Sequence, residues 1–160
     1  MYKKRMDLDA VKTFIDNQPE GTRIYIGADS ERLSVDGVFY ADYALCIVVH
    51  IGGRYGCKVF GEISRERDFD QKASRPAMRL MNEVFKVAEL FQKLQEVLVD
   101  KNVEVHLDIN PDECATSSIV IQQAIGYIRG TCNTMPKVKP QAFAASYCAD
   151  RLKTLMPFIN

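Results

Sequence analysis

The pattern of apolar and polar positions along the chain predicts a protein that mixes strands and helices. Alternating or continuously apolar stretches typical of strands occupy five segments: residues 23–29, 39–51, 54–63, 103–108 and 138–144. Apolar residues recur at helical spacing in four others: residues 7–18, 76–98, 111–129 and 147–156. The second strand segment is apolar on both faces from Tyr43 to Ile51, which is typical of a strand in the middle of a sheet.

Short signals in the sequence predict where these elements begin and turn. Asp7 is placed to cap the first helix, and Pro76 suits the first turn of the long helix. Asn110-Pro111 forms a cap and first helical residue of the same kind. Asp36-Gly37 and Gly52-Gly53 predict the turns of two successive hairpins.

The order of the elements predicts the topology of an α/β sheet. The first three strands are joined by short turns and should form an antiparallel meander. The last two strands each follow a helix, which implies crossover connections and parallel pairing to the first strand. We therefore expect a five-stranded mixed sheet of order 3-2-1-4-5, counted along the chain, with helices on both faces.

Composition predicts an ordinary soluble domain. The chain has 160 residues, of which 47% are hydrophobic and 26% charged, a balance typical of one globular unit. No apolar run approaches the roughly 20 residues that a membrane-spanning helix needs. Asp7 and Asp9 follow the basic N-terminus at the point where a secretory signal would need an apolar stretch. We therefore expect a cytoplasmic protein with no membrane partner.

The cysteines and histidines argue against two kinds of site. The five cysteines are widely spaced and form no C-x-x-C pair: Cys46, Cys57, Cys114, Cys132 and Cys148. With His50 and His106 as the only histidines, this spacing argues against a zinc site, and no Cys–His pair has the setting of a nucleophile. Cys46 and Cys57 lie in apolar strand segments, where we expect free thiols that pack as small hydrophobic side chains.

The formal net charge is +0, with 21 basic and 21 acidic side chains, but the charges are unevenly spread along the chain. Acidic residues predominate in 96–113, whereas basic residues predominate in 64–79 and 129–153. Basic flanks around an acidic centre allow a polyanionic ligand. Scattered solvated charges explain the same distribution without a ligand, so the charge pattern leaves both interpretations open.

Two aspartates follow strands that the predicted topology places side by side. Asp29 ends the strand of Ile24 and Ile26, and Asp108 ends the strand 103–107. Parallel pairing would bring both carboxylates to the carboxyl edge of the sheet, where ligand sites of α/β proteins lie. Adjacent carboxylates repel unless a cation neutralises them, and Mg²⁺ or Mn²⁺ prefers such oxygen ligands. The alternative is that each aspartate only caps a turn.

Two further carboxylates are candidates for the same site. Glu83 is in line with the apolar stripe of the long helix, at the border of its buried face. Glu89 is its competitor, but it shares a side with Lys86 and Lys93 and is expected to be a solvated ion-pair partner. Asp150 lies early in the last helix, where it could instead complement the positive helix end, worth at most about 1 kcal/mol.

The order of these carboxylates resembles the ribonuclease H-like superfamily. Its members have three linked strands, a helix, and then alternating strands and helices. Their acidic residues lie on the first strand, the first helix, the fourth strand and the last helix, the places that Asp29, Glu83, Asp108 and Asp150 occupy here. Four segments resemble, more narrowly, the YkuK-type family of predicted ribonuclease H-related nucleases: Ile26-Gly27-Ala28-Asp29-Ser30, His106-Leu107-Asp108-Ile109-Asn110, Val138-Lys139-Pro140 and Ala145-Ser146-Tyr147-Cys148-Ala149-Asp150.

The resemblance implies a nuclease that uses two Mg²⁺ or Mn²⁺ ions. Asp29 would bridge both ions. Glu83 and Asp108 would complete the coordination of one ion, and Asp150 that of the other. The ions would promote in-line attack of water on a phosphodiester bond of RNA, an RNA/DNA hybrid or structured DNA.

The resemblance also implies contacts to the nucleic acid. Ser30 and Lys139 would bind substrate, with the Lys139 ammonium on a phosphate. Arg75, Arg79 and Arg151 are weaker candidates, because ordinary surface charge is the simpler explanation for each.

At the level of the whole chain, the resemblance covers residues 7–155. It implies one ribonuclease H-like domain over 1–160, with 1–20 as an N-terminal helical extension. It also leaves room for a homodimer, because a small resolvase-like enzyme would work as a dimer.

Two other functions remain open from the sequence. The first is a catalytically inactive ribonuclease H-like domain that binds a nucleic acid or a protein. The second is nucleotide phosphotransfer on the related actin-like ATPase fold. That reaction would need two such domains and glycine-rich phosphate loops, for which only Gly52-Gly53 is suggestive.

Overall fold

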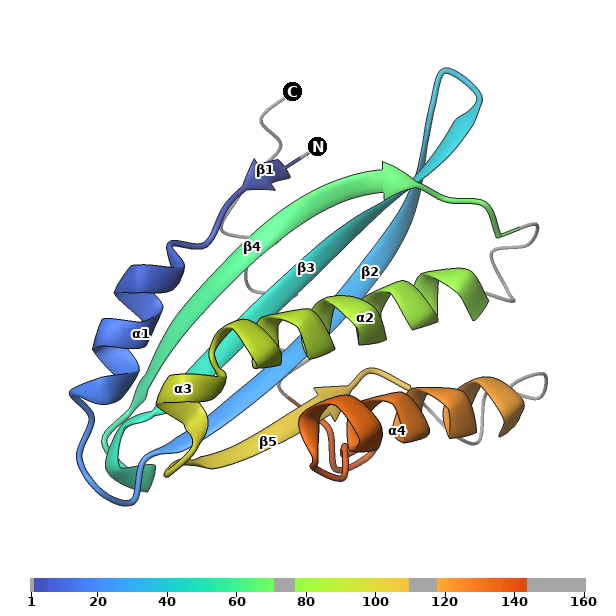
Figure 1. Cartoon of the computed structure of the whole chain (residues 1–160). Helices are drawn as coiled ribbons and strands as arrows, with labels where there is room; N and C mark the ends of the chain where they lie inside the picture. Colours follow the sequence, from blue (N-terminus) through green and yellow to red (C-terminus); the bar gives the residue numbers. More distant parts are fainter. Residues whose placement is uncertain (1, 71–76, 110–117, 144–160) are drawn as a thin grey trace.

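A curved five-stranded sheet forms the centre of the protein in this computed structural model, which describes residues 2–70, 77–109 and 118–143 (Figure 1). The strand order across the sheet is β1-β4-β3-β2-β5. The strands span the following residues: β1 Tyr2–Lys4, β2 Arg23–Val35, β3 Val38–His50, β4 Cys57–Arg67 and β5 Asn102–Leu107.

The four long strands follow the predicted topology. β3 pairs antiparallel with both β2 and β4, so it is central, as its continuous apolar pattern predicted. β5 pairs with β2 in parallel, after a helical crossover. The predicted order of the first four strands, three antiparallel and then one parallel, is therefore confirmed.

The ends of the sheet differ from the prediction. The short strand β1 joins the free edge of β4, where the sequence analysis expected only a helical extension. The prediction of a strand at 138–144 is wrong for the described residues, 138–143, which form no strand. Just before them, Lys137 forms an isolated parallel bridge to His106. Pro136 and Pro140 flank this short contact, and proline has no N–H to donate to a neighbouring strand.

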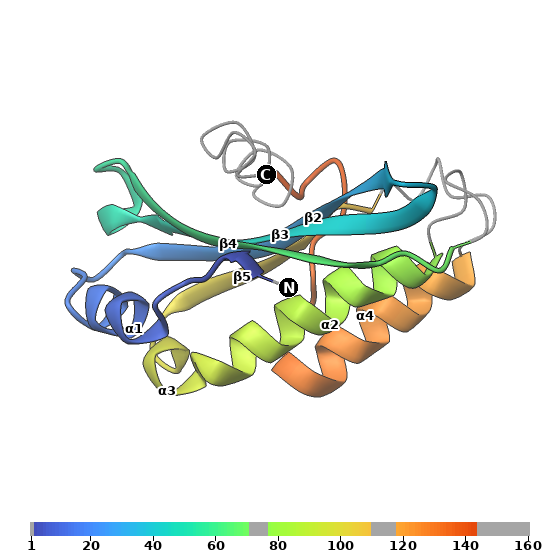
Figure 2. The same ribbon diagram turned by 90° about the horizontal axis from the view of Figure 1, so that it is seen from above.

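The described α-helices lie on one face of the sheet, whereas a short 3-10 helix, Ile51–Gly53, connects β3 to β4 (Figure 2). The α-helices are α1 Leu8–Asp16, α2 Ala77–Lys93, the short α3 Gln95–Leu98 and α4 Ser118–Cys132. The prediction placed helices on both faces. The helix expected at 147–156 lies outside the described residues, so the described part of the chain is a sheet with a helical layer on one side.

The main core fills the space between this helical layer and the sheet. Even-numbered residues of β2 and odd-numbered residues of β3 face the helices, which is the period of two that strands impose. The cluster includes these buried side chains: Val11, Ile15, Ile24, Ile26, Ile47, Val49, Val84, Leu94, Val105 and Ile128. A smaller cluster of Tyr25, Cys46 and Val48 covers part of the opposite face.

Local signals located several element boundaries correctly. The Asp7 side chain accepts hydrogen bonds from the backbone N–H groups of Asp9 and Ala10, at 3.1 and 3.2 Å, and so caps α1 as predicted. Asp36 and Gly37 have φ angles of 51° and 78° and form the two-residue turn between β2 and β3.

Other boundaries depend on pairing or packing. β2 was expected to end at Asp29 but continues to Val35, because each of its residues pairs along β3 up to the turn. The predicted helix 76–98 is divided into α2 and α3 at the fully buried Leu94. α4 continues past Gly130 to Cys132, and the expected helix start at Asn110-Pro111 lies outside the described residues.

Candidate functional site

Asp29 and Asp108 lie at the same level on two neighbouring strands. The last paired residues of the parallel strands β2 and β5 are Ala28 and Leu107, so Asp29 and Asp108 come next on each side. Ala28 and Leu107 pack in the core beneath the helices, and side chains alternate along a strand. Both aspartates therefore belong to the opposite face, on chains about 4.8 Å apart.

Asp29 is positioned inside a continuous strand, not at a strand end as predicted. It pairs with Ala44 of β3, and its Oδ1 accepts a hydrogen bond from the backbone N–H of Ser30 at 2.8 Å. Asp108 follows β5 directly, as expected. The aspartates differ because β2 has a second neighbour, β3, that continues the pairing beyond this point.

Glu83 approaches from the helical layer. It lies on α2 and is only 5% exposed, and its Oε1 accepts a hydrogen bond from the Ser30 hydroxyl. Ser30 is the residue after Asp29, so its backbone binds one carboxylate and its side chain the other. The sequence predicted that Glu83 lies at the border of the buried face of the helix, whereas in the structure its side chain is buried between α2 and the sheet.

The carboxylate of Glu83 lies in an unfavourable electrostatic environment. Burial raises the pKa of Glu83 well above its usual range, and the nearby charges of Asp29 and Asp108 raise this pKa further. The hydrogen bond from Ser30 and the charge of Arg79 act in the opposite direction. Three of the four predicted carboxylates are thus close enough to influence one another, and such crowding favours a proton or a cation.

A lysine neutralises one of these carboxylates. The Nζ atom of Lys139 lies 2.6 Å from Oδ1 of Asp108, and the side chains are 41% and 14% exposed, respectively. The family resemblance implied that Lys139 contacts a phosphate. The structure joins its ammonium instead to a proposed metal ligand, Asp108.

The backbone holds Lys139 in place beside Asp108. Lys137 donates its N–H to the Val105 carbonyl at 2.8 Å, and its own carbonyl accepts from Leu107 at 2.9 Å. Lys139 then donates its N–H to the carbonyl of Ile109 at 3.0 Å. These bonds attach the segment to β5 and to the residues that follow it, so the ion pair rests on a fixed backbone.

A buried histidine attaches the far end of the same segment. His106 is fully buried, and its Nδ1 accepts a hydrogen bond from the backbone N–H of Phe143 at 3.3 Å. Its Nε2 lies 2.9 Å from Glu104 and is therefore the ring nitrogen that donates. Burial lowers the pKa of His106, although Glu104 opposes the shift, which favours a neutral ring with a structural role.

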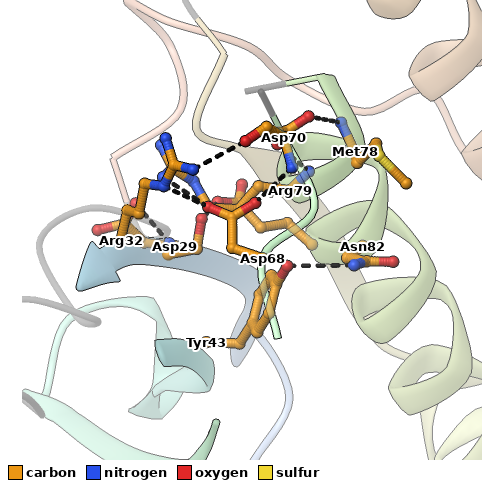
Figure 3. Close-up of polar contacts among 10 residues, drawn as sticks. Asp29, Arg32, Tyr43, Asp68, Asp70, Met78, Arg79 and Asn82 are labelled. Carbon is orange, nitrogen blue, oxygen red and sulfur yellow. Dashed lines mark hydrogen bonds and ion pairs between the residues drawn. The ribbon is translucent and has the colours of Figure 1, made fainter. Parts of the chain in front are cut away.

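A second polar cluster supports the site from the helical side (Figure 3). Arg32 from β2 and Arg79 from α2 both reach Asp68, which follows β4 and has a side chain only 2% exposed. The distances to Asp68 Oδ2 are 3.1 Å from Arg32 Nε and 3.8 Å from an Arg79 terminal nitrogen. This cluster joins β2, β4 and α2 close to the positions of Asp29 and Glu83.

Asp70 fixes the beginning of α2 within this cluster. Its carboxylate accepts hydrogen bonds from the backbone N–H groups of Met78 and Arg79, each at 3.0 Å. Its carbonyl accepts from Arg32 at 2.8 Å. Sequence reasoning missed this role, because an N-cap normally comes directly before its helix, whereas Asp70 precedes the first residue of α2, Ala77, by several positions.

A tyrosine supports the helix next to Glu83. Asn82 donates a hydrogen bond from its side chain to the hydroxyl of Tyr43 on β3 at 3.1 Å (Figure 3). Tyr43 is 1% exposed, and burial raises its pKa to about 12. The bond fixes α2 against the sheet one residue before Glu83.

The remaining predicted residues fall into two groups. Asp150, Arg75 and Arg151 lie outside the described residues. Glu89, the rejected competitor of Glu83, has a 65% exposed side chain paired with Lys93 at 2.9 Å, as predicted. Lys86, which was expected on the same side, pairs instead with Glu66 of β4 at 2.6 Å.

The free cysteines are partly as expected. Cys46 is buried in the sheet, as predicted. Cys57 is exposed, which corrects the expectation that it packs inside, because it is the first residue of β4. Cys132 is buried at the end of α4.

The acidic residues suit a hard divalent cation by their chemistry. Asp29, Glu83 and Asp108 supply carboxylate oxygens, the ligands that Mg²⁺ and Mn²⁺ prefer. Within 2–70, 77–109 and 118–143, no three His, Cys, Asp or Glu side chains are gathered so as to hold a metal ion. Ser30 and Lys139 bind these carboxylates instead, so a metal ion would have to replace protein donors.

The fold and the site define a class of protein. The described chain is a mixed α/β protein in which Asp29 of β2 and Asp108 after β5 lie level with each other and act electrostatically on Glu83 of α2. The ribonuclease H-like family model matches residues 7–154, and the chain belongs to this family.

Comparisons with curated proteins and with solved structures gave no match to the chain. In the part of the chain that the structure describes, no helix is long and apolar enough to span a membrane.

Proposed function

We propose that this protein is a metal-dependent nuclease that hydrolyses phosphodiester bonds of RNA, an RNA/DNA hybrid or structured DNA. The observation that carries the proposal is that Asp29 and Asp108 lie level with each other where the β2–β5 pairing ends, and that their charges act on the buried carboxylate of Glu83. Isolated turn caps would not require carboxylates from distant segments to lie close enough to influence one another. Membership of the ribonuclease H-like family supports the same interpretation.

Each residue has a distinct role in the proposed site. Asp29 and Glu83 are held in position by the backbone and the hydroxyl of Ser30, respectively. Asp108 presents its carboxylate beside Asp29 from the neighbouring strand. Asp150 remains the proposed fourth ligand. When bound, two Mg²⁺ or Mn²⁺ ions would stabilise the attacking and leaving oxygens of the reaction.

The proposed partner is a nucleic acid, with Lys139 and Ser30 as contacts near the scissile phosphate. We also propose a cytoplasmic location and keep the homodimer as a proposal. The uneven charge of the chain is compatible with a polyanion, because a basic residue lies next to the acidic centre.

Calorimetric titration of Mn²⁺ and Mg²⁺ tests the proposal. The wild-type protein should bind metal, and Asp29→Asn or Asp108→Asn should remove that binding. Glu89→Gln is the control, because the Glu89 side chain is 65% exposed and pairs with Lys93 at 2.9 Å. The same proteins should be assayed for cleavage of RNA, hybrid and branched DNA. Metal-dependent cleavage that survives in Asp108→Asn would contradict the proposed site.

One observation favours a second candidate function, a catalytically inactive domain that binds a nucleic acid or a protein. The carboxylate of Asp108 is already neutralised by Lys139, as in a site that has exchanged a metal for an internal ion pair. Titration in the presence of a non-cleavable RNA/DNA hybrid separates the two functions. Binding of the hybrid without any effect of metal would favour the inactive domain.

A further inference from the structure

We propose that Lys139 is a built-in counter-ion of Asp108, which a divalent cation must displace before the site is loaded. This inference rests on the proposed function and adds a mode of regulation to it. In the free protein the ammonium occupies the acidic site. Metal binding then releases the lysine, which becomes available to a phosphate of the nucleic acid.

Lys139 and Asp108 form a close and well-positioned ion pair. Lys139 Nζ is 2.6 Å from Asp108 Oδ1, and the Asp108 side chain is only 14% exposed. The backbone N–H of Lys139 is held by the carbonyl of Ile109 at 3.0 Å. The lysine therefore loses little backbone freedom on forming the pair, unlike a long side chain that crosses an exposed surface.

Asp108 lies near other acidic side chains. Burial disfavours the ionised form of Glu83, and the charges of Asp29 and Asp108 disfavour it further. One positive charge among these carboxylates reduces the repulsion between them, as a bound metal ion would also do. Two cations cannot both stay within a few ångströms of Asp108 without repelling each other. Lysine and metal therefore compete for this carboxylate.

The Lys139 ammonium can also move from Asp108 into solvent. Its side chain is 41% exposed, so the ammonium can swing from Asp108 towards solvent while the backbone stays fixed. A nucleic acid phosphate near the acidic centre would then accept the displaced charge. Metal and nucleic acid should consequently bind with positive cooperativity. The metal frees the Lys139 ammonium for a phosphate, and the phosphate stabilises the displaced ammonium.

The same segment provides a matched control. Lys137 pairs with Glu104 at 2.6 Å, its side chain is 46% exposed, and its backbone is also bonded to β5. Glu104 and Asp108 alternate onto the same face of the sheet, but Glu104 has no place among the proposed metal ligands. The two lysines thus differ chiefly in the carboxylate that they neutralise.

Mn²⁺ titration by calorimetry of wild type, Lys139→Met, Lys139→Arg and Lys137→Met tests the inference. Methionine keeps the alkyl stem and removes the charge, so Lys139→Met should bind Mn²⁺ roughly tenfold more tightly than wild type. Lys139→Arg should stay close to wild type, and Lys137→Met should change affinity less than about twofold. A circular dichroism melt of each variant verifies folding.

The outcomes separate this inference from the proposed function. If wild type binds Mn²⁺ and Lys139→Met binds it no more tightly, the competition is overturned and the proposed metal site stands. If Lys139→Met binds Mn²⁺ and wild type does not, the competition is supported in its strongest form. If neither protein binds, both the competition and the metal-dependent function are overturned.

NMR spectroscopy of the lysine side chains tests the displacement of Lys139 directly. In protein with ¹³C-methylated lysines, addition of Mg²⁺ should shift the Lys139 resonance and leave that of Lys137 in place. The Lys139→Arg and Lys137→Arg variants assign the two signals. Saturation with Mg²⁺ that leaves the Lys139 resonance unmoved would overturn the displacement.

Discussion

The hydroxyl of Ser30 donates a hydrogen bond to the carboxylate of Glu83, although 53 residues separate the two in the chain. Ser30 lies on β2 beside Asp29, and Glu83 lies on the buried side of α2. This bond connects the sheet to the helical layer one residue after Asp29. It offsets part of the cost of burying the Glu83 carboxylate.

A double-mutant cycle should measure this bond. Ser30→Ala should lower the free energy of unfolding by about 1–3 kcal/mol, because the buried carboxylate loses a donor. In a Glu83→Gln background the same change should cost less, since a neutral amide tolerates the loss better. Urea unfolding with EDTA present measures all four proteins, and strictly additive effects would show that the two residues are uncoupled.

The choice between the two glutamates of α2 can be tested by activity. Glu83→Gln should reduce metal-dependent cleavage by about 100-fold or more, since it removes a charged oxygen ligand. It should not destabilise the metal-free protein much, because it also removes a buried charge. Glu89→Gln is the matched control, with an exposed side chain on the same helix. A larger loss in Glu89→Gln than in Glu83→Gln would invalidate the assignment of the helical ligand.

The cluster around Asp68 should be important for stability. Asp68→Asn leaves Arg32 and Arg79 without their shared carboxylate and should lower the free energy of unfolding by about 3 kcal/mol. Asp42→Asn breaks the more accessible pair with Arg65 and should cost about 1 kcal/mol. Chemical denaturation of both variants provides the comparison. Equal losses would mean that the Asp68 cluster contributes no more than a surface ion pair.

The free cysteines should differ sharply in reactivity. Cys57 is exposed and should react with iodoacetamide in the folded protein, whereas the buried Cys132 should react only after unfolding. Burial raises the pKa of Cys132 to about 11, so almost none of its reactive thiolate is present at neutral pH. Peptide mass mapping of the labelled protein distinguishes the sites, and rapid labelling of Cys132 would contradict its burial.

The raised pKa of Cys132 also makes the stability of the protein depend on pH. The folded-state pKa of Cys132 lies above its ordinary value of 9.0, so the folded protein holds this proton more tightly than the unfolded chain. Its contribution to stability is therefore complete below pH 9 and is lost as the pH rises towards 11. The stability of wild type relative to Cys132→Val should fall over this range, and a constant difference would contradict the shift.

Local sequence information was sufficient for much of the fold. The Asp7 cap, the Asp36-Gly37 turn and the long apolar run of β3 each depend on residues close together in the chain. Such signals identify elements because backbone geometry and side-chain periodicity are set within a few residues. The topology of the four long strands followed from the lengths of their connections.

Other parts of the fold needed knowledge of the neighbours. β2 extends to Val35 because β3 pairs with it up to the turn, and β1 exists because β4 leaves an edge open. The segment after Pro136 carried a strand-like pattern, but proline limits its pairing to a short bridge. The pattern of side chains alone does not report such lost backbone donors.

Some features of the candidate site could likewise be predicted from the sequence, and others required the folded structure. The strand order and the parallel crossover could be predicted from the chain, and they suffice to bring Asp29 level with Asp108. The contacts of each carboxylate could not be predicted in this way: Ser30 for Glu83, Lys139 for Asp108, and two arginines for Asp68. These contacts join segments far apart in the chain, and electrostatic interactions depend on distance and burial, which only the folded arrangement sets.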